Sequence, residues 1–147
     1  MILYMELWKD AFLTGSYIVH MLFEWFLCIY VFILPKQFDI FYALYIFLLI
    51  FLKFIFRYEC IINFMDKKLV DSSYELGSDP KDIPFKRELY DNNSYLILFI
   101  NFLIVLNLII LIVRNKNVFI KGLSFFNIII WIFIEYKTQD YYKIIFA

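Results

Sequence analysis

One run of nineteen residues limits what this chain can fold into. From Tyr95 to Val113 the sequence contains no charged residue, and only Asn101 and Asn107 interrupt its apolar character. A helix that crosses the hydrocarbon core of a membrane needs about 20 mostly apolar residues, so this run has the length of one crossing. The composition agrees, because 64% of all residues are hydrophobic, against about 45–50% in ordinary soluble domains. We therefore expect an integral membrane protein.

Three further apolar runs predict four membrane spans in all, at about residues 11–34, 38–56, 95–113 and 118–134. Pro35 ends the first run, and the short link Pro35-Lys36-Gln37 makes the first two spans an antiparallel hairpin. The fourth run is only just long enough to cross, so a re-entrant or interfacial segment is its alternative. The expected fold is all-α, a single membrane domain (residues 1–147) with four transmembrane helices in an up-down bundle.

The segment between the second and third spans, residues 57–94, is expected to form a cytoplasmic loop that begins as a helix. Tyr58, Ile62, Met65 and Leu69 recur at spacings of four, three and four residues, with charged residues between them. This pattern predicts an amphipathic extension of the second span. From Asp71 onwards, Ser, Gly and Pro signals without periodicity predict irregular chain.

The distribution of charge predicts the orientation. With four spans, both termini and the 57–94 loop share one side, which carries ten Lys and Arg residues against four on the other side. The positive-inside rule then places both termini on the cytoplasmic (or matrix) side. The net charge is zero, which argues against a nucleic-acid partner. Abundant Ile, Phe, Tyr, Asn and Lys beside few Gly, Pro, Ala and Arg indicates an AT-rich genome.

Five polar residues within the spans are the candidate site. His20 and Glu24 are four residues apart on one helix face, near the middle of the first span. Charged side chains at that depth cost roughly 2.5–3.5 kcal/mol on insertion scales, so they require partners. Asn101 and Asn107 in the third span and Asn127 in the fourth lie at similar depth, and Asn joins helices well. We expect a polar layer of His20, Glu24, one of the two span-three asparagines and Asn127.

Two interpretations of this polar layer remain open. It is either structural, fixing the register of the helices with Glu24 protonated or paired with His20, or functional. A functional layer would be a proton or ion relay, or a binding site for a polar headgroup or a quinone. A metal or haem site is disfavoured, because one His supplies one axial ligand and groups that climb one helix diverge. The sequence contains no catalytic motif, so we expect neither an enzyme nor a cofactor.

The region around Cys60 gives a further motif. Cys60 is interpreted either as a juxtamembrane palmitoylation site or as a partly buried structural thiol, and both Cys28 and Cys60 are expected to be reduced. The pattern His20-x-x-Phe23, followed by Cys60-Ile61-Ile62-Asn63-Phe64-Met65-Asp66-Lys67-Lys68-Leu69, resembles a class of small uncharacterised multi-span membrane proteins of bacteria and large DNA viruses.

The resemblance covers about residues 10–85. In that class a span with a His precedes a second span that ends in Cys-x-Leu-Thr-x-x-Glu. Here Asn63 stands in place of the Thr, Asp66 in place of the Glu, and Ile61 where a Pro often follows the Cys. The resemblance implies no activity. It implies only that His20, Cys60 and Asp66 belong to one structural signature.

The function that these observations favour is that of a non-enzymatic subunit or scaffold of a membrane assembly. Its expected partners are the lipid bilayer and either other membrane subunits or further copies of itself. The alternative is a small transport or proton-relay protein that uses His20 and Glu24. A membrane-bound enzyme acting on lipids comes third, because the candidate catalytic groups do not cluster at an interface.

Overall fold

The computed structural model describes residues 2–138, and within this range its regular elements are all helical. Four helices are long: α1 (Ile2–Ile33), α2 (Asp39–Ile55), α5 (Ser94–Arg114) and α6 (Val118–Thr138). Three are short: the 3-10 helix η1 (Lys36–Phe38), α3 (Ile61–Val70) and α4 (Pro84–Tyr90). The C-terminal end, expected on the cytoplasmic side, lies outside the described residues.

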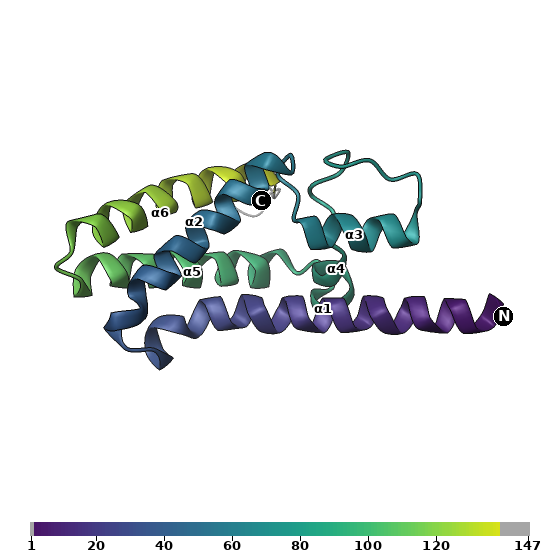
Figure 1. The fold of residues 1–147 in the computed structure, drawn as a ribbon, viewed down its shortest axis with the longest axis horizontal. Helices are drawn as coiled ribbons and strands as arrows, with labels where there is room; N and C mark the ends of the chain where they lie inside the picture. Colours follow the sequence, from purple (N-terminus) through teal and green to yellow (C-terminus); the bar gives the residue numbers. More distant parts are fainter. Residues whose placement is uncertain (1, 139–147) are drawn as a thin grey trace.

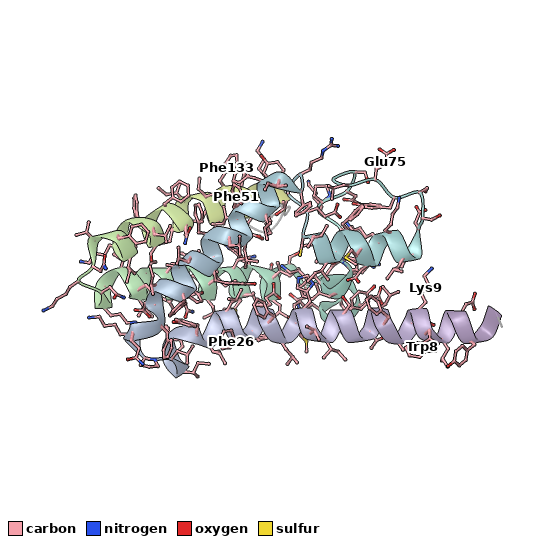
Figure 2. The ribbon with its side chains drawn as sticks, in the orientation of Figure 1. Trp8, Lys9, Phe26, Phe51, Glu75 and Phe133 are labelled. Carbon is pink, nitrogen blue, oxygen red and sulfur yellow. The ribbon has the colours of Figure 1, made fainter. Side chains whose placement is uncertain are left out.

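Four segments are long and apolar enough to cross a membrane: Glu6–Ile33, Lys36–Ile55, Ser94–Arg114 and Val118–Thr138. This confirms the four candidate spans. The fourth is longer than expected, because its helix continues beyond Ile134 as far as Thr138. Large apolar side chains on these helices remain exposed, and Figure 2 shows Phe26, Phe51 and Phe133 among them. Such surfaces suit a lipid environment.

The long helices alternate in direction along the chain (Figure 1). α5 contacts α1 on one side and α6 on the other, and α6 also packs against α2. α2 crosses the other helices diagonally, so the first two spans, although joined by a short link, make most of their helix contacts elsewhere. The order of contacts is therefore α1–α5–α6–α2.

α1 is longer than a membrane crossing requires. Its 32 residues correspond to about 48 Å at 1.5 Å per residue, whereas the hydrocarbon core of a bilayer is about 30 Å thick. The helix begins nine residues before the expected start of the first span at residue 11. This N-terminal part extends beyond the other long helices and lies beside α3 (Figure 1). The hydroxyl of Ser16 donates a hydrogen bond to Asp66 of α3 at 3.0 Å.

The expected amphipathic extension of the second span is wrong in one respect, because α2 and α3 are separate helices. α2 ends at Ile55, and Arg57 and Tyr58 adopt left-handed φ angles of 51° and 68°. The backbone N–H of Tyr58 donates to the carbonyl of Lys53, which closes the helix end. The turn places the buried Glu59 where Lys67, Tyr74 and the backbone N–H of Gly77 donate hydrogen bonds to it. The spacing of apolar residues predicts which face of a helix is apolar, but it does not predict that the helix is interrupted between Ile55 and Ile61.

α4 lies in a segment that the sequence indicated as irregular. Pro84 is its first residue, a position where proline is favoured because its missing N–H would be unpaired in any case. From the sequence alone, Pro84 indicates a helix break, because proline cannot continue a helix that precedes it. α4 packs against α1 and so covers the middle of the N-terminal helix.

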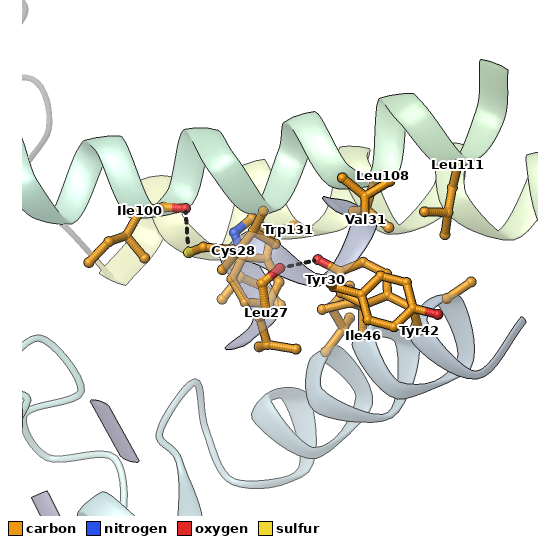
Figure 3. Close-up of a cluster of buried hydrophobic side chains, with 14 of the residues drawn as sticks. Leu27, Cys28, Tyr30, Val31, Tyr42, Ile46, Ile100, Leu108, Leu111 and Trp131 are labelled. Atoms are coloured by element: carbon orange, nitrogen blue, oxygen red, sulfur yellow. Dashed lines mark hydrogen bonds between the residues drawn. The ribbon is translucent and has the colours of Figure 1, made fainter. Parts of the chain in front are cut away.

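The apolar core lies among the four long helices. Its most deeply buried side chains include Ile100, Ile104, Leu108 and Leu111 of α5 and Ile46 of α2. Figure 3 shows two hydrogen bonds within this core. The thiol of Cys28 donates to the carbonyl of Ile100 (3.7 Å), and the hydroxyl of Tyr42 donates to the carbonyl of Leu27 (3.0 Å). Side-chain donors thus bind helix carbonyls directly in the core.

Candidate functional site

The five candidate polar residues lie in separate groups. Asn107 donates to the carbonyl of Cys28 at 2.6 Å and accepts from the N–H of Val31 at 2.8 Å, so it joins α5 to α1. Asn127 donates to the carbonyl of Ala43 at 2.8 Å and joins α6 to α2. Both asparagines are fully buried, and each binds the backbone of a neighbouring helix.

Asn101 belongs to a different group. Its amide donates to Glu135 at 3.2 Å, and its carbonyl accepts from the indole N–H of Trp131 at 3.1 Å. Glu135 also forms an ion pair with Lys53 at 2.8 Å. These contacts join α2, α5 and α6 near the C-terminal ends of α2 and α6. Asn127 is therefore not part of a layer with Asn101, since residues on different turns of the helices find different partners.

His20 and Glu24 meet α4. Glu24 forms an ion pair with the amine of Lys86 at 3.2 Å and accepts a hydrogen bond from the hydroxyl of Tyr90 at 3.2 Å. The imidazole of His20 stacks on the ring of Phe85, with 4.4 Å between the ring centres. The partner of Glu24 is thus a lysine of the loop rather than His20. Sequence reasoning missed it because Lys86 looks like one of many solvated charges.

A cavity of about 420 Å³ brings three of the five residues together. The side chains that bound it come from all six α-helices, Phe85 and Lys86 of α4 among them, and from the links before α3 and α4. The polar residues on its lining include His20, Glu24, Lys53, Cys60, Asn63 and Asn101. Asn107 and Asn127 are not on this lining. The cavity is the candidate site of the molecule.

The motif residues around Cys60 lie at the same place. The thiol of Cys60 is 3.9 Å from Nε2 of His20, and Asn63 follows on the first turn of α3. Nucleophilic catalysis needs a base within about 2.6–3.2 Å of the nucleophile and a third group that orients the base. The 3.9 Å between sulfur and nitrogen is at the long limit of a hydrogen bond to sulfur, and no group among the described residues binds Nδ1 of His20 to orient the ring. This geometry does not favour an activated thiol.

Asp66, the last residue of the motif, lies one turn beyond the cavity. Burial raises the pKa of Asp66, and the hydrogen bond from the hydroxyl of Ser16 opposes this shift only in part. Its other oxygen, Oδ1, is buried without a hydrogen-bond partner. Asp66 thus connects α3 to the N-terminal part of α1.

The loop after α3 is attached by a buried lysine. The amine of Lys67 binds Glu59 at 2.6 Å, the hydroxyl of Tyr74 at 3.1 Å and the carbonyl of Asp79 at 2.6 Å. Burial lowers the pKa of Lys67, but the bonds to Glu59 and Tyr74 outweigh burial and the net shift is upward. The amine therefore stays charged and fixes the loop.

The opposite end of the long helices carries another buried charge. Asp39, the first residue of α2, is fully buried and accepts hydrogen bonds from Arg114 and Asn115 at the end of α5. Arg114 also donates to the carbonyl of Val31 in α1 at 3.0 Å. The sequence contained a signal for this clamp, because opposite charges stand at the ends of two spans that face the same side. The same signal holds for Lys53 and Glu135.

A groove of about 840 Å³ runs between the N-terminal part of α1 and α3. It is apolar and open, with Phe12 55% exposed on α1 and Met65 52% exposed on α3. Lys9 and Lys68 also line it, and Figure 2 shows Lys9 on the side of α1 that faces α3. The groove lies beside the cavity, separated from it by the Ser16–Asp66 contact.

Neither a metal site nor similarity to a known protein assigns a function to the cavity. Among the described residues, no group of three or more His, Cys, Asp or Glu side chains is placed to hold a metal ion. Comparisons with protein-family models, curated proteins and solved structures found no match to this chain.

Proposed function

We propose that this chain is a non-enzymatic, multi-pass membrane protein that serves as a subunit or scaffold of a membrane assembly. Its four long helices then form an up-down bundle across the bilayer, with both termini on the cytoplasmic (or matrix) side. The observation that carries the proposal is the exposed apolar groove between the N-terminal part of α1 and α3. It is a surface for a second protein.

The length of α1 places this groove away from lipid tails. If the four long helices occupy the hydrocarbon core, roughly the first twelve residues of α1 extend beyond it, because the helix is about 18 Å longer than the core. Exposed apolar side chains such as Phe12 and Met65 then face water or headgroups, where contiguous apolar patches mark interaction sites. Lys9 and Lys68 favour a partner helix with an apolar stripe and flanking acidic residues.

The ion pairs inside the protein support a structural role. Glu24–Lys86, Lys53–Glu135 and Asp39–Arg114 each connect different helices. Charged groups that are held in ion pairs fix how the helices pack. They are poorly suited to a proton relay, because each would have to leave its partner to transfer a proton. The apolar side chains of Ile104, Leu108 and Leu111 also lie between the cavity and the Asp39 clamp. This arrangement disfavours a proton path from one side to the other.

The test is extraction of the tagged chain from its native membrane in mild detergent, with size determination and mass spectrometry of co-migrating proteins. Phe12→Ala removes the groove aromatic, and Phe32→Ala is the matched control, because Phe32 is 68% exposed on the same helix and outside the groove. We expect one defined complex that Phe12→Ala weakens at least about tenfold and Phe32→Ala leaves intact. A lone monomer, or equal effects of both variants, contradicts the proposal.

The proton-relay alternative has its own readout. His20→Ala combined with Glu24→Gln is reconstituted in liposomes, and proton or solute flux is compared with that of the unchanged protein. The scaffold proposal expects no flux in either sample. A flux that only the unchanged protein supports, with both proteins folded, favours the relay instead.

A further inference from the structure

The cavity at His20 has the size and lining of a small-molecule site. Its volume of about 420 Å³ falls in the roughly 300–1,000 Å³ range of ligand pockets, which are mostly apolar with a few placed polar groups. Leu27, Leu49 and Ile104 provide apolar wall from three of the long helices. Polar side chains come from every helix of the lining, and His20 on α1 and Asn63 on α3 are two of those without charge.

Two residues of the lining each have a buried polar atom without a hydrogen-bond partner among the described residues. These atoms are Oδ1 of Asn63 and Nδ1 of His20, and Asn63 is only 5% exposed. Leaving a buried polar group unpaired is unfavourable by roughly 1–3 kcal/mol. One hydroxyl group of an occupant would relieve both, because it donates its single proton to Oδ1 of Asn63 and accepts from the Nδ1–H of His20, in the tautomer whose Nε2 faces the Cys60 thiol. The unpaired atoms therefore favour an occupant with a group that both donates and accepts, as a hydroxyl does.

The charges on the lining exclude a charged headgroup. Each charged side chain of the lining is already neutralised by an opposite charge, in the pairs Lys53–Glu135, Glu24–Lys86 and Glu59–Lys67. An anionic or cationic headgroup would have to break one of these pairs and leave a buried ion uncompensated, which is strongly unfavourable. An uncharged headgroup leaves all three pairs intact.

The exposed part of the lining shows how an occupant would enter. Val19, Phe23 and Ile62 line the cavity and are also exposed on the surface. A rim of large apolar side chains favours passage of an apolar chain from the bilayer over passage of a water-soluble molecule.

We propose that the cavity binds one uncharged lipid alcohol, with its hydroxyl group on Asn63 and His20 and its hydrocarbon chain against Leu27, Leu49 and Ile104. Long-chain alcohols and monoacylglycerols belong to this class. The binding requires no partner in the α1–α3 groove, so it stands independently of the scaffold function.

The experiment uses the full chain in lipid nanodiscs and two photoreactive probes. Hexadecanol and hexadecanoic acid, each with a diazirine at the same chain carbon, are compared at equal concentration, and the labelled peptides are mapped by mass spectrometry. We expect saturable labelling of cavity-lining peptides by the alcohol, about tenfold stronger than by the acid, and its displacement by unlabelled monoacylglycerol. Equal labelling by both probes overturns the proposal.

Variants separate the cavity from the general lipid surface. Leu49→Trp fills the cavity and should abolish the saturable labelling, whereas Leu48→Trp is the matched control, because Leu48 is exposed and off the lining. Asn63→Leu should remove the preference for the alcohol while the protein stays folded, because the deleted carbonyl has no partner to lose. Full labelling of Leu49→Trp, or an unchanged preference in Asn63→Leu, refutes the assignment. If Leu49→Trp fails to fold, Asn63→Leu alone decides.

Discussion

The clamp between Asp39 and Arg114 predicts an asymmetric response to mutation. Asp39 is 0% exposed and accepts hydrogen bonds from both Arg114 and Asn115, whereas the Arg114 side chain is 23% exposed. Removing Arg114 therefore leaves a fully buried anion, while removing the charge of Asp39 leaves a cation that can still reach water. The two single substitutions break the same ion pair but have different costs.

The magnitudes follow from this difference in burial. Breaking a buried pair so that one charge is uncompensated destabilises by about 3–5 kcal/mol, which we expect for Arg114→Leu. Asp39→Asn keeps the shape and one acceptor, so we expect about 1–3 kcal/mol for the weakened hydrogen bonds. The double variant leaves no buried charge and should resemble Asp39→Asn. Its destabilisation then falls short of the sum of the two by at least about 2 kcal/mol.

The assay is unfolding in mixed micelles of a mild detergent with increasing SDS, followed by tryptophan fluorescence. Lys116→Leu is the control, because Lys116 is exposed in the same link as the clamp and should change stability by less than about 0.5 kcal/mol. Equal effects of Asp39→Asn and Arg114→Leu, or additive effects in the double variant, refute the reasoning.

Two further predictions concern α3 and the glycines. Because burial raises the pKa of Asp66, the folded protein loses stability as pH rises from about 3.9, the ordinary Asp value, through the raised pKa. Asp66→Asn should remove this loss in thermal melts between pH 4 and 7, and an unchanged pH profile contradicts it. Gly77 has φ +78°, and a Cβ there would lie 2.6 Å from Cβ of Arg57, so Gly77→Ala should destabilise by about 1–3 kcal/mol. Gly122→Ala, with open space around it, should instead stabilise by about 0.5–1 kcal/mol in the same melts. A lower melting temperature for Gly122→Ala than for Gly77→Ala contradicts this prediction.

The number and positions of the long helices follow from the sequence because a membrane crossing is a local property. A run of apolar residues must satisfy its own backbone hydrogen bonds in lipid, so the run itself defines the helix. The errors lie at the ends. α1 begins far earlier than its apolar run because the N-terminal residues find support in α3, and α2 stops at Ile55 because the chain turns at Arg57 and Tyr58.

The candidate site was predicted less well, because its partners are distant in sequence. His20 and Glu24 were identified from the chain alone, since an ionisable residue in a span requires a partner. Their partners Phe85 and Lys86 lie more than sixty residues away on a short helix that no periodicity indicates. Asn63 stood out only as a departure from the motif of the class that the sequence resembles, and its unpaired carbonyl is a property of the packed protein.

Both ends of the long helices bury ion pairs, and the cavity at the His20 end is the difference that bears on function. At the Asp39 end, both oxygens of the carboxylate are bonded, and the clamp joins three helices. At the His20 end, ion pairs surround a cavity. Unpaired buried atoms occur at both ends, because among the described residues Nδ1 of His20, Oδ1 of Asn63 and the hydroxyl of Tyr30 beside the clamp all have no hydrogen-bond partner. Leaving such atoms unpaired is unfavourable, and only the two at the His20 end belong to residues that line the cavity, where an occupant has room to bind them. An occupant that binds His20 and Asn63 explains why the polarity is kept there.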